Sequence, residues 1–266
     1  MPEWMLVMQV MAVGLLGGLL GGFLGIGGSV IYIPAMLFLA GLDYHTAQAA
    51  ALAVNVLVGI SGAYGHLKSG KVLPSMLKVL IPAAMAASVA GVFVSNLFTG
   101  DNQVWLRRVF GVAMVYVWLV NVYRLMRTTF LKSMPPWLKD GERLDAWRVG
   151  LVGALMGSSA GLLGISGGTV VVPAQQVLLR LRMRTAAANS AVAIIFASLL
   201  AVIIKFLTCP QGMDAGTSLV YAGLLIPPAA IGSFVGSHIT HHVPRNTVRI
   251  VFLAMLVWTI WKMFTA

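Results

Sequence analysis

Two glycine-rich turns carry the residues best able to do chemistry in this chain. The first is GIGGS, from Gly25 to Ser29, and the second is GISGGT, from Gly164 to Thr169. Glycine permits the left-handed backbone of a tight turn and the close approach of a ligand. A short helix that starts near Ser29 or Thr169 would direct its unpaired N–H groups and its positive dipole end at that ligand. The two turns are therefore predicted to bind an anion.

The positions of the acidic residues also favour an anion. All of them fall in predicted termini or loops: Glu3, Asp43, Asp101, Asp140, Glu142, Asp145 and Asp214. Ionisable residues inside a membrane mark ion pathways, and a carboxylate there suits a cation. Because no carboxylate is predicted near mid-membrane, a site built from N–H dipoles and hydroxyl groups fits an anion better.

The predicted substrate-binding residues lie in the turns and in the helices that follow them. In the first half they are Gly25, Gly27, Gly28, Ser29, Thr46 and Asn55. In the second half they are Gly164, Ser166, Gly167, Gly168, Thr169, Gln175, Asn189 and Ser190. Outside the turns, each polar residue is equally well explained by a hydrogen bond between helices, and Thr46 by a helix N-cap. No catalytic residue, metal site or cofactor is predicted.

Prolines and further glycines flank the turns. Pro34 and Pro173 are predicted structural helix breaks, because proline fits the first turn of a helix or kinks a helix interior. Other glycines precede the first turn at helical spacing: Gly14, Gly17, Gly18, Gly21 and Gly22. Spacings of four residues between small side chains allow membrane helices to approach closely. These earlier glycines are therefore predicted to pack helices rather than to bind substrate.

The composition places most of the chain in a lipid bilayer. Of its 266 residues 59% are hydrophobic and 9% are charged, whereas soluble domains carry roughly 25% charged residues. In hydrocarbon, irregular backbone survives only inside protein or beside a water-filled cavity. The net charge of +11 fits cytoplasmic loops near anionic lipid and gives no reason to expect nucleic acid. The single Cys209 excludes an intrachain disulfide.

The chain divides into two similar halves. An offset of 139 residues aligns Gly25, Gly28 and Pro34 with Gly164, Gly167 and Pro173. We predict a first transmembrane repeat over residues 1–126, a cytoplasmic linker over 127–148 and a second transmembrane repeat over 149–266. The predicted fold is an all-α polytopic membrane protein. Each repeat would contain about four spanning helices plus one glycine-rich element, either a kinked span or a hairpin.

Positive residues decide how the two repeats are related. If each glycine-rich segment is a kinked span, the repeats are parallel and the Lys and Arg residues divide eleven to seven between the two sides. If each segment is a hairpin, the repeats are inverted and the division becomes fourteen to four. Cytoplasmic loops carry an excess of Lys and Arg. Inverted repeats are therefore predicted, with the linker cytoplasmic and both termini outside.

Several motifs together resemble the TauE/SafE family of sulfite exporters and toluene-sulfonate permeases. They are the G-x-G-G turn followed by proline, then GLDYHTAQAAALAVN (41–55) and GHLKSGKV (65–72). The second half repeats the pattern degenerately, with Ser166 at the position of Gly27. The resemblance covers nearly the whole chain. It implies a multi-pass carrier of the prokaryotic inner membrane for sulfite, sulfoacetate or other organosulfonates.

The sequence thus predicts a transporter that exports sulfur-containing anions, driven by the membrane potential or a proton gradient. The potential supplies about 2.3 kcal/mol per charge per 100 mV to an anion leaving the cell. An anion channel and an uptake permease for another small anion remain alternatives. The predicted partners are the anion and the bilayer, without nucleic acid, and the composition allows a homodimer.

An intramembrane serine protease is a remote alternative. GISG resembles the serine turn of rhomboid-like proteases, and His238 lies on a later span. A nucleophilic serine needs a base within hydrogen-bond reach. The first half carries Gly27 where the second carries Ser166, so the turn itself needs no hydroxyl group. No enzyme activity is predicted.

Overall fold

A computed structural model describes residues 3–24, 27–67, 72–126, 144–239 and 245–265 of the chain. These residues form ten α-helices and one 3₁₀ turn, and they contain no strand. The first five helices are α1 (Glu3–Leu24), α2 (Ser29–Leu39), α3 (Tyr44–Leu67), α4 (Pro74–Asn96) and α5 (Gln103–Met126), with the 3₁₀ turn η1 (Gly100–Asn102) before α5. The second five are α6 (Ala146–Leu163), α7 (Gly168–Leu178), α8 (Met183–Thr208), α9 (Ala215–Ile239) and α10 (Arg245–Thr265).

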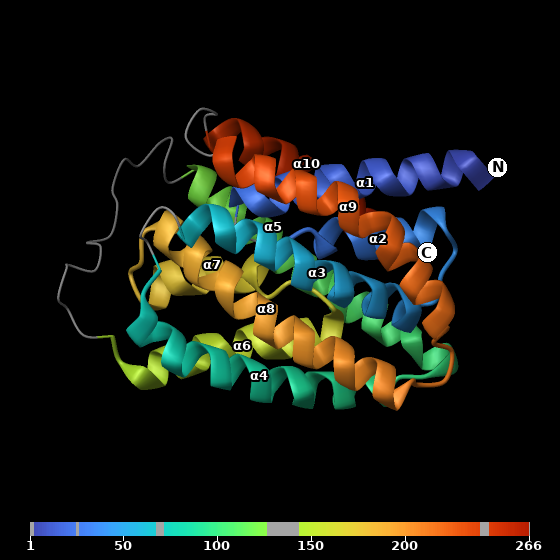
Figure 1. Ribbon diagram of the computed structural model, residues 1–266, viewed down its shortest axis with the longest axis horizontal. Helices are drawn as coiled ribbons and strands as arrows, with labels where there is room; N and C mark the ends of the chain where they lie inside the picture. Colours follow the sequence, from blue (N-terminus) through green and yellow to red (C-terminus); the bar gives the residue numbers. More distant parts are fainter. Residues whose placement is uncertain (1–2, 25–26, 68–71, 127–143, 240–244, 266) are drawn as a thin grey trace.

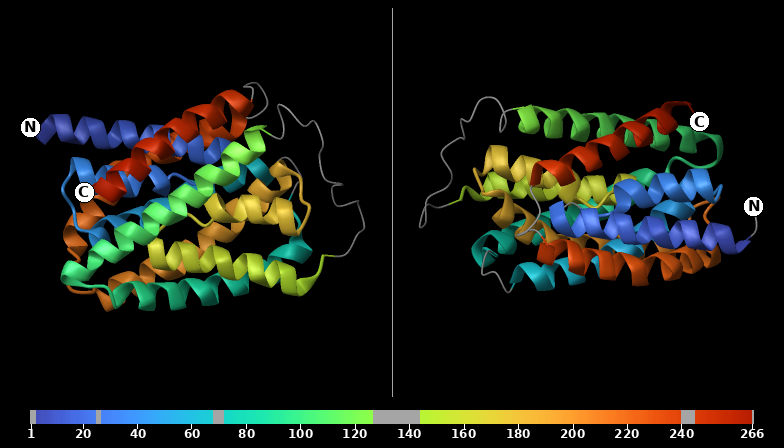
Figure 2. Two further views of the ribbon diagram at one scale, coloured as in Figure 1. Left: turned by 180° about the vertical axis from the view of Figure 1, so that it is seen from behind. Right: turned by 90° about the horizontal axis from the view of Figure 1, so that it is seen from above.

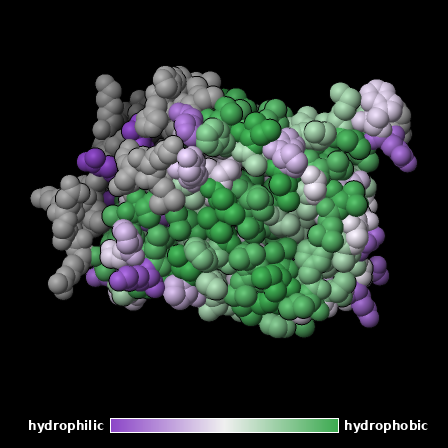
Figure 3. Space-filling model, in the orientation of Figure 1, coloured by the Kyte–Doolittle hydropathy of each residue, from purple (hydrophilic) through white to green (hydrophobic). Residues whose placement is uncertain are grey.

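The protein is a multi-pass membrane protein. Among the described residues, seven helices are long and apolar enough to cross a membrane by length and composition: α1, α3, α4, α5, α6, α8 and α9. The helices run roughly along one long axis (Figures 1 and 2). Apolar surface covers the middle of the molecule, and hydrophilic surface lies toward its two ends (Figure 3). The predicted all-α membrane fold is confirmed.

The two ends of the molecule differ in which helices begin there. We call the end where α1 begins and α10 ends the terminal end, and the opposite end, where α5 ends and α6 begins, the linker end (Figure 1). The helices α3, α5 and α9 also begin at the terminal end, whereas α4, α8 and α10 begin at the linker end (Figure 1). The start of α1 and the end of α10 thus lie opposite the end of α5 and the start of α6, as a hairpin plus three crossings in each half requires. The duplication of the two halves stays a prediction.

The first glycine-rich segment is a hairpin. The helix α2, only 11 residues long, folds back along α1. The Tyr32 hydroxyl of α2 donates to the Gly14 carbonyl of α1 at 3.4 Å, and a Cβ atom on Gly17 would lie 2.3 Å from the Tyr32 ring. The alternative of one kinked span from α1 through α2 is therefore excluded.

The second segment folds in the same way. Gly164 ends α6 in the left-handed conformation, with φ of +72°. The 11-residue helix α7 then returns toward the linker end (Figure 1). A Cβ atom on Gly167 would lie 2.3 Å from Cγ of Met156 in α6. This close approach holds α7 against α6.

The predicted helix breaks at Pro34 and Pro173 are wrong. Each proline lies inside its helix, α2 or α7, and neither ends it. A proline at the sixth residue removes one backbone hydrogen bond, to the second residue of the same helix. The chain instead changes direction before these helices, at the glycine turns.

The helix α1 packs against α9 from the other half. Its glycines bring the two backbones into contact: a Cβ atom on Gly18 would lie 2.2 Å from the Ala229 carbonyl oxygen, and one on Gly22 would lie 2.1 Å from that of Ser233. The predicted packing role of these glycines is confirmed.

The helices α4 and α6 form the corresponding pair. A Cβ atom on Gly157 of α6 would lie 2.0 Å from the Ala84 carbonyl oxygen, and one on Gly161 would lie 2.1 Å from that of Ser88. Both pairs join the first half of the chain to the second. The halves are therefore interlocked, and α3 and α8 pack against each other between the two pairs.

This contact predicts a difference between two glycines of α6. Gly157→Ala should lower the thermal unfolding midpoint, because its Cβ would meet the Ala84 carbonyl and force α6 away from α4, at a cost of about 1–3 kcal/mol. Gly150→Ala is the matched control, since nothing lies within 4 Å of its Cβ position. It should be neutral or stabilising. Thermal unfolding in detergent checks this, and equal midpoints would contradict the packing.

Candidate functional site

The two hairpin turns touch each other in the interior of the bundle. The Ser166 N–H group donates to Oγ of Ser29 at 2.5 Å. A Cβ atom on Gly27 would lie 2.0 Å from Oγ of Ser166. Nδ2 of Asn55 in α3 donates to the Gly164 carbonyl at 3.3 Å. Two segments more than a hundred residues apart in sequence thus form one central structure.

Both turns use left-handed glycine and then start a helix. Gly27 has φ of +71° and Gly164 has φ of +72°. The helix α2 begins at Ser29, as predicted, and α7 begins at Gly168, one residue earlier than predicted. Neither N-terminus carries a side-chain cap, so the positive dipole ends of both helices point at the junction without a neutralising acid.

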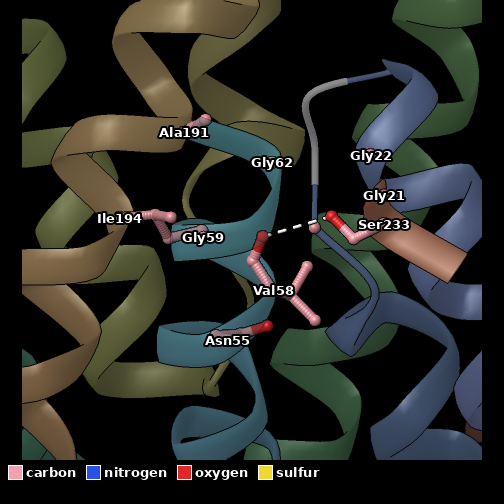
Figure 4. Close-up of a pocket in the computed structure, with 10 residues that line it drawn as sticks. Gly21, Gly22, Asn55, Val58, Gly59, Gly62, Ala191, Ile194 and Ser233 are labelled. Carbon is pink, nitrogen blue, oxygen red and sulfur yellow. Dashed lines mark hydrogen bonds between the residues drawn. The ribbon is translucent and has the colours of Figure 1, made fainter. Parts of the chain in front are cut away.

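A pocket lies beside the first turn (Figure 4). It is lined by residues of α1 and its turn, of α3, of α8 and of α9: Gly21, Gly22, Gly27, Asn55, Val58, Gly59, Gly62, Ala191, Ile194 and Ser233. Oγ of Ser233 donates to the Val58 carbonyl at 3.2 Å across one wall (Figure 4). The lining residues of α3 run from Asn55 to Gly62, so the pocket extends from the turns toward the linker end.

Asn55 joins the pocket to the second turn. Its side chain is buried, and Nδ2 is occupied by the Gly164 carbonyl. Oδ1 is buried and accepts no hydrogen bond from the described residues. A buried acceptor without a partner is costly, so Oδ1 is suited to a water molecule or to a ligand O–H group in the pocket.

Most of the predicted site residues come together at this centre. Gly27 and Asn55 line the pocket. The others at or beside the contact between the turns are Gly28, Ser29, Gly164, Ser166, Gly167, Gly168 and Thr169. The hydroxyl groups of Ser29 and Thr169 bind within this structure, the first accepting from Ser166 and the second donating to the Ser166 carbonyl at 3.0 Å. Gly25 lies outside the described residues.

Thr46 lies away from the centre, at the terminal end. Its N–H group donates to Oδ1 of Asp43 at 3.0 Å, and its hydroxyl group donates to the other carboxylate oxygen. Asp43 therefore caps α3, in the role considered for Thr46. The Asp214 N–H group donates to Oγ1 of Thr46 at 2.9 Å, which ties α3 to the segment before α9.

Three further predicted site residues form hydrogen bonds that join one helix to another. Nε2 of Gln175 donates to Oγ of Ser190 at 3.0 Å, which joins α7 to α8. Oδ1 of Asn189 accepts from the Leu73 N–H group at 2.9 Å, at the start of α4. Asn189 thus lies near the linker end rather than at the junction of the turns.

Two residues that were not predicted hold the second turn in place. The Tyr44 hydroxyl donates to the Leu163 carbonyl at 2.9 Å. Nε2 of Gln48 donates to the carbonyls of Gly161 at 2.8 Å and Leu162 at 3.1 Å. With Asn55, these side chains pair successive carbonyls at the end of α6. Their separations of four and seven residues on α3 match one helix face, and this signal was available in the sequence.

A buried cluster at the terminal end was also missed. Lys205 of α8 is fully buried and lies 2.8 Å from Nδ1 of His45, the residue after Tyr44. In the sequence, Lys205 entered only the count of Lys and Arg residues on the two sides of the membrane. A lysine inside an apolar helix, together with a histidine in the GLDYH motif, was the available signal.

Comparison with known proteins identifies the family to which the chain belongs. It matches the family model described as "Sulfite exporter TauE/SafE" over residues 10–263, which include both hairpins. The chain belongs to the TauE/SafE family. Relatives that the chain matches are described as probable membrane transporter proteins.

The relatives are distant in sequence. The chain is 25% identical to the "Probable membrane transporter protein MamO" of Paramagnetospirillum magneticum, over 98% of this chain and 45% of that protein. It is 23% identical to the "Probable membrane transporter protein YunE" of Bacillus subtilis, over 93% of both chains. The chain thus spans less than half the length of the MamO protein but nearly all of YunE. No solved structure matches.

The contact between the turns predicts a defect that a second substitution repairs. Gly27→Ala should reduce transport, because its Cβ would collide with Oγ of Ser166 and also meet the strain of a positive φ, about 1–2 kcal/mol. Gly41→Ala introduces similar backbone strain, at φ of +65°, but its Cβ would have no atom within 4 Å. This variant therefore measures the effect of the strain without the collision. Adding Ser166→Gly to Gly27→Ala should restore flux in liposomes. Failure of the rescue would show that the collision is not the cause.

Proposed function

We propose that this TauE/SafE transporter carries sulfur-containing anions, such as sulfite, sulfoacetate or other organosulfonates, and exports them from the cell. The contact between the two hairpin turns is the observation that supports this proposal. It directs two helix N-termini at one interior region, where an anion gains from both dipole ends.

The charges near the junction suit an anion. Every described acidic residue lies at or near a helix end: Glu3, Asp43, Asp101, Asp145 and Asp214. None of them lines the pocket, so no described carboxylate there repels an anion or recruits a cation. The unpartnered Oδ1 of Asn55 suits an oxyanion that retains a proton, such as hydrogen sulfite, or an anion with bound water.

The packing on the two sides of the turns is unequal, which favours a carrier over a channel. The pocket extends toward the linker end. Toward the terminal end, the fully buried side chains of Tyr44, Gln48 and Lys205 lie between α3 and its neighbours. A carrier exposes its central site to one side at a time, and unequal packing on the two sides of the turns suits such a protein.

The distribution of charge supports export. The described linker end carries Lys78, Arg148, Arg180, Arg182 and Arg184, close to the starts of α4, α6 and α8. Because cytoplasmic loops are rich in Lys and Arg, we assign the linker end to the cytoplasm and both termini to the outside of a prokaryotic inner membrane. The pocket then lies on the cytoplasmic side of the turns, and the inside-negative potential drives an anion outward. A homodimer stays a prediction.

A protease function gains no support from the site. His238 lies near the end of α9, toward the linker end, and its Nδ1 is 2.8 Å from the Phe234 carbonyl of its own helix. Ser166 lies at the central turn, where its N–H group binds Ser29. Ser166 and His238, which a serine protease would have to pair, therefore lie in different regions of the molecule.

Flux measurements in liposomes test the transport function. Sulfite and alkanesulfonates should leave loaded vesicles when a potassium gradient sets the voltage, and chloride should leave more slowly. Asn55→Leu should reduce flux about tenfold or more, because it removes both the pocket acceptor and the bond to the second turn. Asn121→Leu is the matched control, since among the described residues Asn121 bonds to its own helix alone, at the Val117 carbonyl. Flux of chloride equal to that of sulfite would overturn the proposed substrate class.

A further inference from the structure

Lys205 is the centre of a polar cluster that joins three helices at the terminal end. Nζ lies 2.8 Å from Nδ1 of His45 in α3. It donates to Oδ1 of Asn96 at 2.7 Å, beside the end of α4, and to Oγ of Ser95 at 3.3 Å. The side chain of Lys205 is fully buried, and so is that of His45. Ionisable groups buried within membrane spans are expensive and are usually functional.

The ammonium group has no acidic partner among the described residues. An ammonium has three N–H donors, and His45, Asn96 and Ser95 accept one each. All three acceptors are neutral, and no described carboxylate lies within ion-pair distance of Nζ. Because the protein already occupies every N–H donor, an anion would find none available. The ligand that this cluster is suited to bind is a proton.

The hydrogen bond between Lys205 and His45 provides a route for that proton. Nε2 of His45 lies 2.8 Å from the Phe98 carbonyl, which can only accept, so Nε2 carries a hydrogen. Nδ1 of the neutral ring is then the acceptor for Lys205. Transfer of one proton from Nζ to Nδ1 leaves a neutral amine and an imidazolium, which donates to Phe98 and to Nζ. The pair can thus hold the proton on either group.

Hydrogen bonds connect the cluster with the surface. Nδ2 of Asn96 donates at 2.8 Å to Oγ1 of Thr208, which is exposed at the terminal end. Lys205 is therefore separated from solvent by one layer of polar side chains. A proton can reach it from the terminal end, with Asn96 lining the way.

Other hydrogen bonds connect the cluster with the second hairpin. The Ser95 hydroxyl, which accepts from Lys205, donates to Oε1 of Gln48 at 3.0 Å. Nε2 of Gln48 donates to the carbonyls of Gly161 and Leu162, just before the second turn. Loss of the Lys205 proton removes a donor from this chain. The position of the second hairpin therefore responds to the protonation of the pair.

Few charged groups face the pair. The helix α3 contributes His45 itself, and Asp43 before it is the acid whose charge acts on both members. The helix α4 contributes the uncharged Ser95 and Asn96. Of α6 and α7, which also pack on α8, only α6 has a charged side chain, Arg148, and it lies at the linker end.

We propose that Lys205 and His45 form a proton-binding site, reached from the terminal end, which couples proton movement to anion transport. This inference rests on the proposed transport function, because it assigns the coupling ion of the same carrier. The pair holds a proton near one face of the membrane while the anion pocket extends toward the other.

The coupling is tested in liposomes that contain a pH-sensitive dye. An alkanesulfonate is the substrate, because it stays ionised and carries no proton itself. In the wild-type protein, lumenal pH should change in proportion to net sulfonate flux. Lys205→Gln and His45→Gln should lose about tenfold or more of this proton movement while they still exchange internal for external sulfonate. Lys262→Gln, a lysine near the end of α10 beside Phe38 and Trp261, is the control and should keep the coupling.

A second measurement needs no transport. Separate samples are first tested for monomeric dispersion and for a thermal unfolding transition, which show that each variant is folded. Purified protein in detergent is then acidified, and the protons that it binds are counted with an indicator dye. Wild type and Lys262→Gln should bind about one proton more per chain than the double variant Lys205→Gln/His45→Gln, because either member of the pair alone can still take the proton. Equal proton binding by the three proteins overturns the site and leaves the transport function standing. A missing proton in the double variant, without flux of any sulfur anion by the wild type, overturns the transport function and keeps the site.

Discussion

A turn inside a membrane is possible only if its backbone is paired, because hydrocarbon offers no partner. The last carbonyls of α6 face this problem where the second hairpin turns. Tyr44, Gln48 and Asn55 of α3 supply the donors. This requirement accounts for the position of α3, which is more buried than any other candidate span. The central site depends on it, since Asn55 serves the turn and the pocket at once.

The glycine contacts determine which parts can move together. The helix α1 is joined to α9 and α6 to α4 by direct approach of their backbones. The two predicted repeats, residues 1–126 and 149–266, are therefore joined along these two interfaces. A rocking motion that keeps both interfaces intact would carry α1 and α2 with α9 on one side, and α6 and α7 with α4 on the other. The two turns would then separate along the contact between Ser29 and Ser166.

Local signals in the sequence were sufficient for the hairpins but not for the side-chain network. Gly27 and Gly164 have a left-handed backbone, a conformation that favours glycine, so the residue type itself indicates the turn. Pro34 misled the prediction because proline is compatible with a helix that can spare one hydrogen bond. The link between His45 and Lys205 joins positions 160 residues apart. No spacing rule reaches that far, so Lys205 was counted only among the Lys and Arg residues divided between the two sides.

The interlocked halves also constrain how the protein is made. The helix α1 leaves the ribosome well before α9, the helix that covers its glycine face. Until then, the face around Gly18 and Gly22 lacks its partner backbone. A chain cut after α5 would be left with half of each glycine interface. Insertion can proceed helix by helix, but the packing of α1 must wait until α9 has been synthesised.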